Sequence, residues 1–199
     1  MARIIKLPGP AHDGKLAVET ALLGRRSIRD YREGPLELHE ISQLLWAAQG
    51  IVRPGGYRTC PSAGALYPLE LQLVAGAVGG LPQGSYRYDF ANHAILLENQ
   101  KDVRGDLTVA ALGQSMISRA PATIAISAIF ERTTRRYGER GIRYIFMEAG
   151  HAAQNIHLQA VSLNLGTVVI GAFRDEEVKK ALGLQPDESP LLLMPVGRI

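Results

Sequence analysis

The stretch Arg25-Arg26-Ser27-Ile28-Arg29-Asp30-Tyr31 says most about the fold of this chain, and a second stretch, Pro61-Ser62-Ala63-Gly64-Ala65-Leu66-Tyr67-Pro68, complements it. The first stretch puts three guanidinium groups and a hydroxyl group within five residues, directly after an apolar run that suits a helix. Such a set of donors suits a phosphate better than a solvated surface. The second stretch is a turn of small residues, whose backbone a flat ligand can approach closely. Together they predict a site for a phosphorylated aromatic cofactor.

Length and composition indicate a folded protein with one sizeable core. The chain has 199 residues, 46% of them hydrophobic, and a net charge of +3 that is spread along the sequence. This weak charge gives no support to nucleic-acid binding. The apolar runs are shorter than the ~20 residues that a membrane span requires. The chain has one cysteine and no signal-peptide pattern, so we expect a cytoplasmic protein with a single domain over residues 1–199.

Helix and strand signals alternate along the chain. Apolar residues at helical spacing predict helices over 15–23, 36–49, 103–112, 141–163 and 175–182. Short apolar runs between turn residues predict strands over 69–78, 86–90, 94–97, 122–129, 167–170 and 191–196. The second and third of these strands form a hairpin, and the long helices are segregated from it. We therefore expect an α+β fold rather than a doubly wound parallel sheet.

The longest predicted helix contains a glycine that its sequence does not explain. The inward face of this helix is predicted to carry Ile142, Ile145, Phe146, Ala149, Ala153, Ile156 and Ala160. Gly150 costs about 1 kcal/mol relative to alanine in a helix interior. We expect another backbone to approach the helix at this position, the alternative being a tolerated surface glycine.

Other kinds of site find little support in the sequence. The histidines show no i,i+4 pair and no cysteine companion, so we expect no metal site. The motifs of serine hydrolases, P-loop enzymes and Rossmann dinucleotide sites are absent. Cys60 has no histidine near it in the sequence, which favours a passive, partly buried thiol over a nucleophile. The arginines between 132 and 143 form either a second anion site or a solvated helix entry paired with Glu131 and Glu139.

Four segments, taken together, resemble the FMN-dependent nitroreductase superfamily. They are the arginine motif at 25–31, the turn at 61–68, EAGHAAQN at 148–155 and LGTVVIGAF at 165–173, and they lie in the same order over roughly residues 17 to 198. More narrowly, they are similar to the branch that contains the azoline-oxidising dehydrogenases of thiazole- and oxazole-bearing peptides. The resemblance implies a central, mostly antiparallel sheet flanked by helices. It also implies an interlocked homodimer in which each FMN site is built from both chains.

The resemblance also assigns roles to residues of the arginine motif and of the later segments. Arg25 and Ser27 match positions that hold the FMN phosphate, with Arg26 beside them, and Arg29 matches a basic residue that faces the pyrimidine edge of the flavin. Gln114 corresponds to an amide that hydrogen-bonds the same edge, the alternative being a polar residue at a helix end.

Further positions complete the implied cofactor site. The residues that would reach the flavin from the second subunit are Pro61, Ser62, Ala63, Gly64 and Leu66. Ile170 and Gly171 fall where backbone N–H groups approach the flavin N5 side. Arg198 matches a basic residue that returns to the phosphate, the alternative being a frayed terminal arginine.

The function that the resemblance implies is FMN-dependent oxidoreduction. Hydride would pass from NAD(P)H through FMN to a nitroaromatic, a quinone or a similar small conjugated acceptor, with no nucleic acid, membrane or metal involved. Alternatives are oxidation of an azoline-type ring with oxygen as acceptor, a non-catalytic FMN-binding protein, and an enzyme that consumes the flavin itself. We identify no catalytic acid or base, since Tyr67 and Tyr137 are more typical of packed aromatic residues.

Overall fold

The fold is built around one antiparallel sheet. In a computed structural model that describes residues 3–199, seven strands pair in the order β1-β6-β5-β4-β7-β9-β8. All neighbouring strands in this sheet run antiparallel. The strands are β1 (Ile4–Lys6), β4 (Leu69–Ala75), β5 (Gly84–Asp89), β6 (Ala94–Asn99), β7 (Ala122–Ile129), β8 (Leu165–Thr167) and β9 (Glu188–Arg198). A separate hairpin consists of β2 (Ile51–Arg53) and β3 (Tyr57–Arg58).

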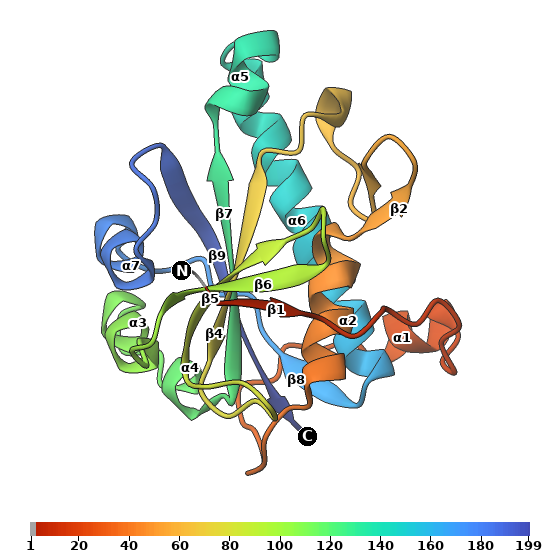
Figure 1. The fold of residues 1–199 in the computed structure, drawn as a ribbon, viewed down its shortest axis with the longest axis vertical. Coiled ribbons are helices and arrows are strands. Elements are labelled where there is room, and N and C mark those ends of the chain that lie inside the picture. Colours follow the sequence, from red (N-terminus) through yellow and green to blue (C-terminus); the bar gives the residue numbers. More distant parts are fainter. Residues whose placement is uncertain (1–2) are drawn as a thin grey trace.

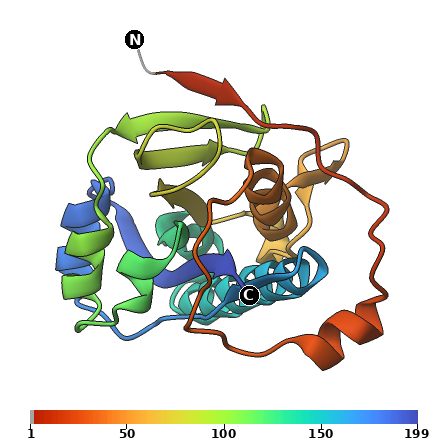
Figure 2. The same ribbon diagram turned by 90° about the horizontal axis from the view of Figure 1, so that it is seen from below.

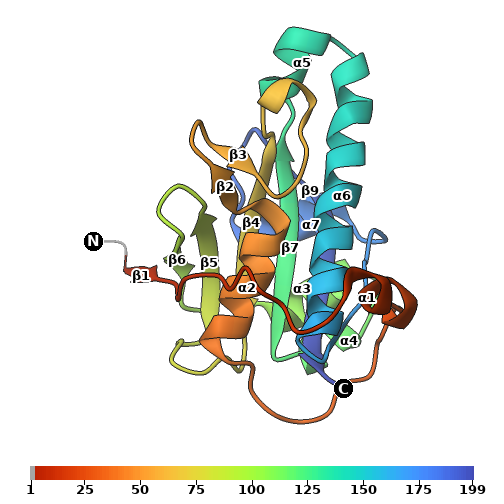
Figure 3. The same ribbon diagram turned by 90° about the vertical axis from the view of Figure 1, so that its right-hand side faces the viewer.

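Helices cover both faces of this sheet (Figures 1 and 2). On one side lie α1 (Val18–Gly24), α2 (Leu38–Gln49) and α6 (Arg140–Ser162), and on the other α3 (Arg104–Ala110), α4 (Met116–Arg119) and α7 (Asp175–Leu182). Figure 3 shows α5 (Glu131–Tyr137) and the short η1 helix (Ala63–Ala65) together beyond one end of the sheet. The expected α+β architecture, a mostly antiparallel sheet flanked by helices, is confirmed. None of the helices within the described part of the chain has the length and hydropathy of a membrane span.

The central strands are buried on both faces because helices cover both faces. Every residue of β4 is buried, and successive side chains point to opposite sides of the sheet. Leu71 and Leu73 pack in the core beneath α2 and α6, whereas Val74 packs in the core beneath α3 and α7. The run is not wholly apolar, since the polar Glu70 is buried in it as well and is paired with Arg87 and Arg132.

The helix α2 has clear local signals at both ends. At its start, the Glu37 N–H donates to Glu40 Oε2 at 2.8 Å, as part of a capping box. At its end, a Cβ atom at Gly50 would lie 2.1 Å from a Trp46 ring carbon, so only glycine fits there. The predicted end of this helix at residue 49 is therefore confirmed, whereas the helix begins at Leu38 rather than at 36.

The C-terminal strands differ from their predicted bounds. A strand is predicted over 167–170, but β8 begins at Leu165 because Asn164 takes a left-handed conformation (φ 55°) and reverses the chain directly after α6. Ile170 instead makes an isolated bridge to Leu193. The last strand, β9, is longer than the predicted 191–196 because it pairs with β7 on one side and β8 on the other.

The inward face predicted for α6 is wrong at its N-terminal end. Ile145, Ala149 and the later members of the stripe are buried, but Ile142 is 40% exposed and Phe146 is 54% exposed. This part of α6 extends past the sheet towards α5, as Figure 3 shows. Nor does a backbone of this chain approach Gly150, because a Cβ atom there would have nothing within 4 Å.

Candidate functional site

The arginine motif at 25–31 lies flat against the β8–β9 edge of the sheet. The Ile28 N–H donates to the Thr167 carbonyl oxygen at 2.9 Å, and the Tyr31 hydroxyl lies 3.1 Å from the carbonyl oxygens of Ile28 and Pro195. A Cβ atom at Gly197 would lie 2.6 Å from Tyr31 Cγ. The glycine therefore creates the space in which the Tyr31 ring anchors the motif.

Because the backbone of the motif is extended, its alternate side chains point to opposite sides. Arg25, which ends α1, has φ −64° and ψ 123°, and successive side chains of extended backbone point in opposite directions. Arg25 and Ser27 line one hollow, whereas Arg26 and Ile28 line another, smaller one. Arg26 thus borders a different hollow from Arg25 and Ser27, and its part in cofactor binding stays a prediction.

The hollow beside Arg25 and Ser27, which we call the α6 hollow, has a volume of about 400 Å³. Its other lining residues are Phe146, Ala149, Gly150, Ala153, Gln154, His157, Val169, Leu191 and Leu192. No acidic side chain lines it among the residues that the structure describes. Burial lowers the pKa of His157, and the charge of Arg25 lowers it further, so His157 is neutral at pH 7. One cation above an apolar floor suits a ligand with an anionic tail and a flat ring.

Gly171 comes two residues after Val169, which lines the hollow, and Gln114 contacts the next residue, Ala172. A Cβ atom at Gly171 would have only Leu192 Cδ2 near it, at 3.9 Å, so packing inside the chain does not require glycine there. The Ile170 N–H, by contrast, already donates to the Leu193 carbonyl oxygen at 2.9 Å. Gln114 Nε2 donates to the carbonyl oxygens of Ala111 and Ala172, both at 3.0 Å. Of the two predicted backbone donors, the Ile170 N–H is thus already engaged within the chain, and the role of Gly171 stays a prediction.

The remaining predicted arginines are placed differently. Arg29 is exposed, and its carbonyl oxygen accepts a hydrogen bond from Arg119 Nη2 at 3.3 Å. Arg198 is not frayed: its guanidinium donates to Glu40 Oε1 at 2.5 Å and Oε2 at 2.8 Å, and to the Pro35 carbonyl oxygen at 3.0 Å. The Arg198 guanidinium is therefore paired with Glu40, and its predicted contact with the phosphate of a cofactor stays a prediction.

The turn at 61–68 is strained and locked by local hydrogen bonds. Gly64, Ala65 and Tyr67 have positive φ values of 63°, 53° and 46°. The Tyr67 N–H donates to Ser62 Oγ at 2.9 Å, which closes the turn. Such backbone strain persists only where its surroundings impose it, and it is concentrated at functional sites.

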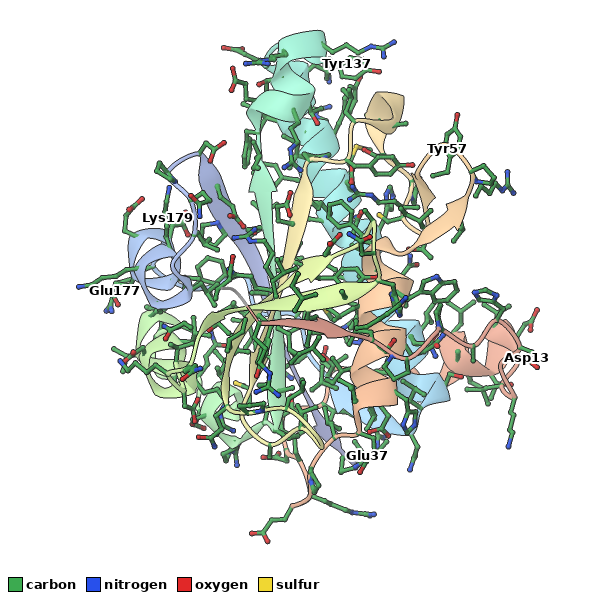
Figure 4. All side chains as sticks on the ribbon, viewed as in Figure 1. Asp13, Glu37, Tyr57, Tyr137, Glu177 and Lys179 are labelled. Atoms are coloured by element: carbon green, nitrogen blue, oxygen red, sulfur yellow. The ribbon has the colours of Figure 1, made fainter. Side chains whose placement is uncertain are left out.

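This turn lies at the other end of α6 from the arginine motif. A Cβ atom at Gly64 would lie 2.8 Å from the hydroxyl oxygen of Tyr137, which Figure 4 labels on α5. The arginine motif instead borders the hollow near His157, towards the C-terminal end of α6. One copy of the chain therefore does not gather Pro61 to Leu66 around the same space as Arg25.

Two arginines of the run between 132 and 143 form ion pairs. Arg132 Nη1 lies 2.6 Å from Glu70 Oε1 and donates to the Tyr67 carbonyl oxygen at 3.2 Å, which ties α5 to the end of the turn. Arg135 pairs with Glu131 on the helix surface at 2.9 Å. Arg135 fits the solvated alternative with its pair to Glu131, whereas Arg132 pairs with the buried Glu70, which the sequence did not predict.

Two buried side chains, those of Cys60 and Glu148, lie next to the turn at 61–68. Cys60 is fully buried, and burial together with the nearby Glu148 raises the pKa of its thiol to about 12. The prediction of a passive thiol is therefore confirmed, although the side chain is more deeply buried than expected. In the sequence, Glu148 stands out only as part of the EAGHAAQN segment. Its position among the apolar residues of an inward helix face is the signal that could have singled it out.

Comparison with known proteins decides the family. The model of the Nitroreductase family matches residues 22–198. The chain belongs to the nitroreductase family. A relative from Methanocaldococcus jannaschii, MJ1384, which carries the name nitroreductase as a provisional assignment, is 47% identical over 184 residues, or 92% of each chain. A crystal structure from Ralstonia eutropha, also provisionally named a nitroreductase, superposes with a TM-score of 0.87 at 31% identity and covers 98% of this chain and 89% of that one.

A more distant relative of this nitroreductase-family chain is the microcin B17-processing protein McbC of Escherichia coli. It is 27% identical over 171 residues, which are 82% of this chain but 63% of McbC. Family membership makes the chain a nitroreductase-family oxidoreductase, and nitroreductases generally use a flavin. The α6 hollow fits such a group, because Arg25 and Ser27 offer donors to a phosphate and Gly150 leaves a ring room to approach the helix.

Proposed function

We propose that the chain forms one FMN-binding unit, and that two copies make an oxidoreductase which transfers hydride from NAD(P)H to a nitroaromatic, quinone or similar conjugated acceptor. The observation that carries this proposal is the α6 hollow, in which Arg25 and Ser27 meet an apolar floor that no acidic side chain of residues 3–199 lines. Bound FMN would accept and donate the hydride, which is chemistry that no side chain of the protein supplies.

The residues of the hollow divide the work of binding. Arg25 grips the phosphate, since a guanidinium group offers two parallel hydrogen bonds to its oxygens. Ser27 adds a hydroxyl donor on the same side of the extended segment. Gly150 and Gly171 leave the ring room to lie against backbone, and the exposed Arg29 supplies positive charge for its pyrimidine edge.

An exposed apolar stripe on α6 supports the homodimer. Ile142, Phe146 and Met147 are exposed by 40%, 54% and 55%, and the exposed Gly150 follows them. Residues at these spacings share one face of a helix, and a continuous apolar face is typical of a protein interface. In the proposed dimer, a second copy covers this stripe and brings its Pro61–Leu66 turn to the hollow of the first copy.

One observation favours a second candidate function. The similarity to McbC, a peptide-processing protein by name, supports an enzyme that oxidises an azoline-type ring and passes the electrons to oxygen. This chain spans only 63% of McbC, so the same activity would have to work with a smaller protein or with partners.

The test begins with FMN binding to the purified protein, followed by light scattering and an anaerobic titration with NADPH and NADH. We expect a dimer that binds FMN and whose flavin absorbance bleaches on titration. Arg25→Gln should weaken FMN binding about ten- to hundredfold, the effect of losing a charge-assisted bidentate contact. Arg135→Gln, which alters only an exposed pair on α5, serves as the matched control.

The outcomes separate the candidate functions. A protein that binds FMN but does not bleach would overturn the reductase and leave the azoline oxidase or a non-catalytic FMN carrier. A substrate-dependent uptake of oxygen would then identify the oxidase. A monomer that retains FMN would overturn the shared site, and a flavin that is cleaved would show up as a new product.

A further inference from the structure

The positive charge of the chain is concentrated where α5 meets α6. Five arginines and two glutamates lie between residues 131 and 143, so this segment alone has the formal charge of +3 that the whole chain has. The rest of the chain is neutral in sum, which corrects the expectation of a charge spread along the sequence. We call residues 131–143 the α5–α6 patch. It lies at the end of the molecule where Figure 3 shows α5 together with the η1 helix of the turn at 61–68.

Arg136 is an unpaired member of this patch that lies against the turn. A Cβ atom at Gly64 would lie 3.3 Å from Arg136 Nη1, and the Arg136 guanidinium carbon lies 5.5 Å from the centre of the Tyr137 ring. Arg136 is exposed, and no carboxylate among residues 3–199 lies within 4.0 Å of its guanidinium nitrogens. Arg132 and Arg135 on the same helix are both paired. Arg136 therefore brings a charge without a counter-ion to the turn.

Contacts of the neighbouring residues hold the backbone around Arg136 in place. Arg132 Nη1 donates to the Tyr67 carbonyl oxygen at 3.2 Å, which ties α5 to the end of the turn. The Tyr137 ring meets the Tyr144 ring of α6 edge to face, with 5.2 Å between the ring centres. A ligand that binds Arg136 thus has less of the protein chain to order, which favours its affinity.

The proposed function indicates which anion Arg136 would meet. In the proposed dimer, the Pro61–Leu66 turn of one copy lies at the flavin of the other copy, and Arg136 is carried there with it. The FMN phosphate is already assigned to Arg25 and Ser27, which line the α6 hollow. Among the other ligands in that scheme, the nitroaromatic and quinone acceptors need no phosphate. NADPH, however, has a ribose phosphate that NADH lacks, and a guanidinium group is well suited to bind it.

We propose that Arg136 of one copy binds the ribose phosphate of NADPH at the flavin of the other copy, and that the enzyme therefore prefers NADPH to NADH. This inference rests on the proposed function, in which the turn and the flavin meet. The rest of the α5–α6 patch adds attraction at longer range, because an excess of positive charge steers a polyanion towards a site. Arg136 thus determines which donor binds and takes no part in the hydride transfer itself.

The test measures kcat/KM for NADPH and for NADH with the FMN-loaded protein and a saturating quinone. We expect the wild-type protein to prefer NADPH by about tenfold or more. Arg136→Gln should lower kcat/KM for NADPH about ten- to hundredfold, mainly through KM, and that for NADH less than about threefold, because only NADPH loses a charge-assisted contact. Arg135→Gln is the matched control, since it removes the same charge from the same last turn of α5, but from an arginine that is paired with Glu131.

The outcomes distinguish this inference from the proposed function. An unchanged ratio of the NADPH and NADH values in Arg136→Gln, an equal fall in Arg135→Gln, or a wild-type preference for NADH would each overturn the inference and leave the reductase in place. A second measurement needs no flavin: calorimetric titration of the FMN-free protein with adenosine 2′,5′-bisphosphate and with adenosine 5′-phosphate. The wild-type protein should bind the bisphosphate about tenfold more tightly, and Arg136→Gln should lose this difference. If neither donor bleached the flavin, the proposed function would fail, and this titration alone would decide whether Arg136 binds the phosphate.

Discussion

Replacing Gly197 with alanine should dislodge the arginine motif from the sheet. A Cβ atom at this position would lie 2.6, 2.7 and 2.8 Å from Cγ, Cβ and Cδ1 of Tyr31. Ordinary contacts between carbon atoms are 3.5–4.0 Å, so the overlap approaches 1 Å. The Tyr31 ring cannot simply swing away, because its hydroxyl group is held between the carbonyl oxygens of Ile28 and Pro195.

The expected cost follows from two opposing effects. Overpacking a well-packed site by one methyl group costs about 1–3 kcal/mol. Replacing glycine also restricts the unfolded chain, which raises the free energy of unfolding by about 0.4–1 kcal/mol. The net loss in the free energy of unfolding is then about 1–2 kcal/mol. For a chain of this size, this corresponds to a fall of roughly 2–8 °C in Tm.

Thermal unfolding of Gly197→Ala and of Gly105→Ala measures this effect. Gly105 is the matched control, because it lies in α3 and a Cβ atom there would have nothing within 4 Å, so its replacement should stabilise the helix. Gly197→Ala should also weaken FMN binding, since the motif that carries Arg25 would shift. A Tm for Gly197→Ala equal to or above that of the wild-type protein would refute the packing on which the site depends.

Three further predictions concern the rest of the chain. Gly150→Ala should raise the Tm of the FMN-free protein, because alanine stabilises a helix by up to about 1 kcal/mol relative to glycine. The same change should weaken FMN binding at least tenfold, because the added methyl group would occupy the space left for the ring. Unchanged FMN affinity would mean that no ring lies against this position. Cys60, with its pKa raised to about 12, should resist iodoacetamide at pH 8 in the folded protein and react in urea, as followed by mass spectrometry. Its contribution to stability should also be lost as the pH rises from about 8.5 towards 12, and rapid labelling of the folded protein would contradict this burial. Arg87→Met should lower the free energy of unfolding by about 3–5 kcal/mol in urea titrations, because it leaves the fully buried Glu188 without its cation; a loss below 1 kcal/mol would argue against this pair.

The sequence predicted those elements that are long or strongly patterned. The strand at Ala122–Ile129 and the helix at Asp175–Leu182 have the predicted bounds, because an apolar run and a capped amphipathic run are strong local signals. The strands β1, β2 and β3 have two or three residues each, which is too short for any period to emerge. No separate helix was predicted at α5, because its arginines indicate a charged surface and its sequence has no apolar stripe at helical spacing.

The site was only partly predictable, for reasons of geometry. The motif itself identifies Arg25 and Ser27. Which other arginine points to the same side depends on the extended backbone after α1, and the helical spacing of apolar residues in α1 does not reveal that conformation. The pair of Arg198 with Glu40 joins residues 158 positions apart, so no local pattern contains it. A resemblance to a family indicates which positions of the sequence belong to the site, whereas the partners of their side chains become known only from the folded structure.

The glycines show which parts of the motifs serve the fold and which remain for a ligand. Gly166 and Gly197 are explained within the chain, because Cβ atoms there would lie 2.8 Å from an Ile28 methyl carbon and 2.6 Å from the Tyr31 ring. Gly150 and Gly171 are not explained in this way: the nearest atom is 3.9 Å away at Gly171, and nothing lies within 4 Å at Gly150. A helix interior that keeps glycine gives up about 1 kcal/mol, and under the proposed function a molecule outside the chain is the reason. Since Gly150 lines the hollow that Arg25 and Ser27 share, that reason and the phosphate donors point to the same ligand.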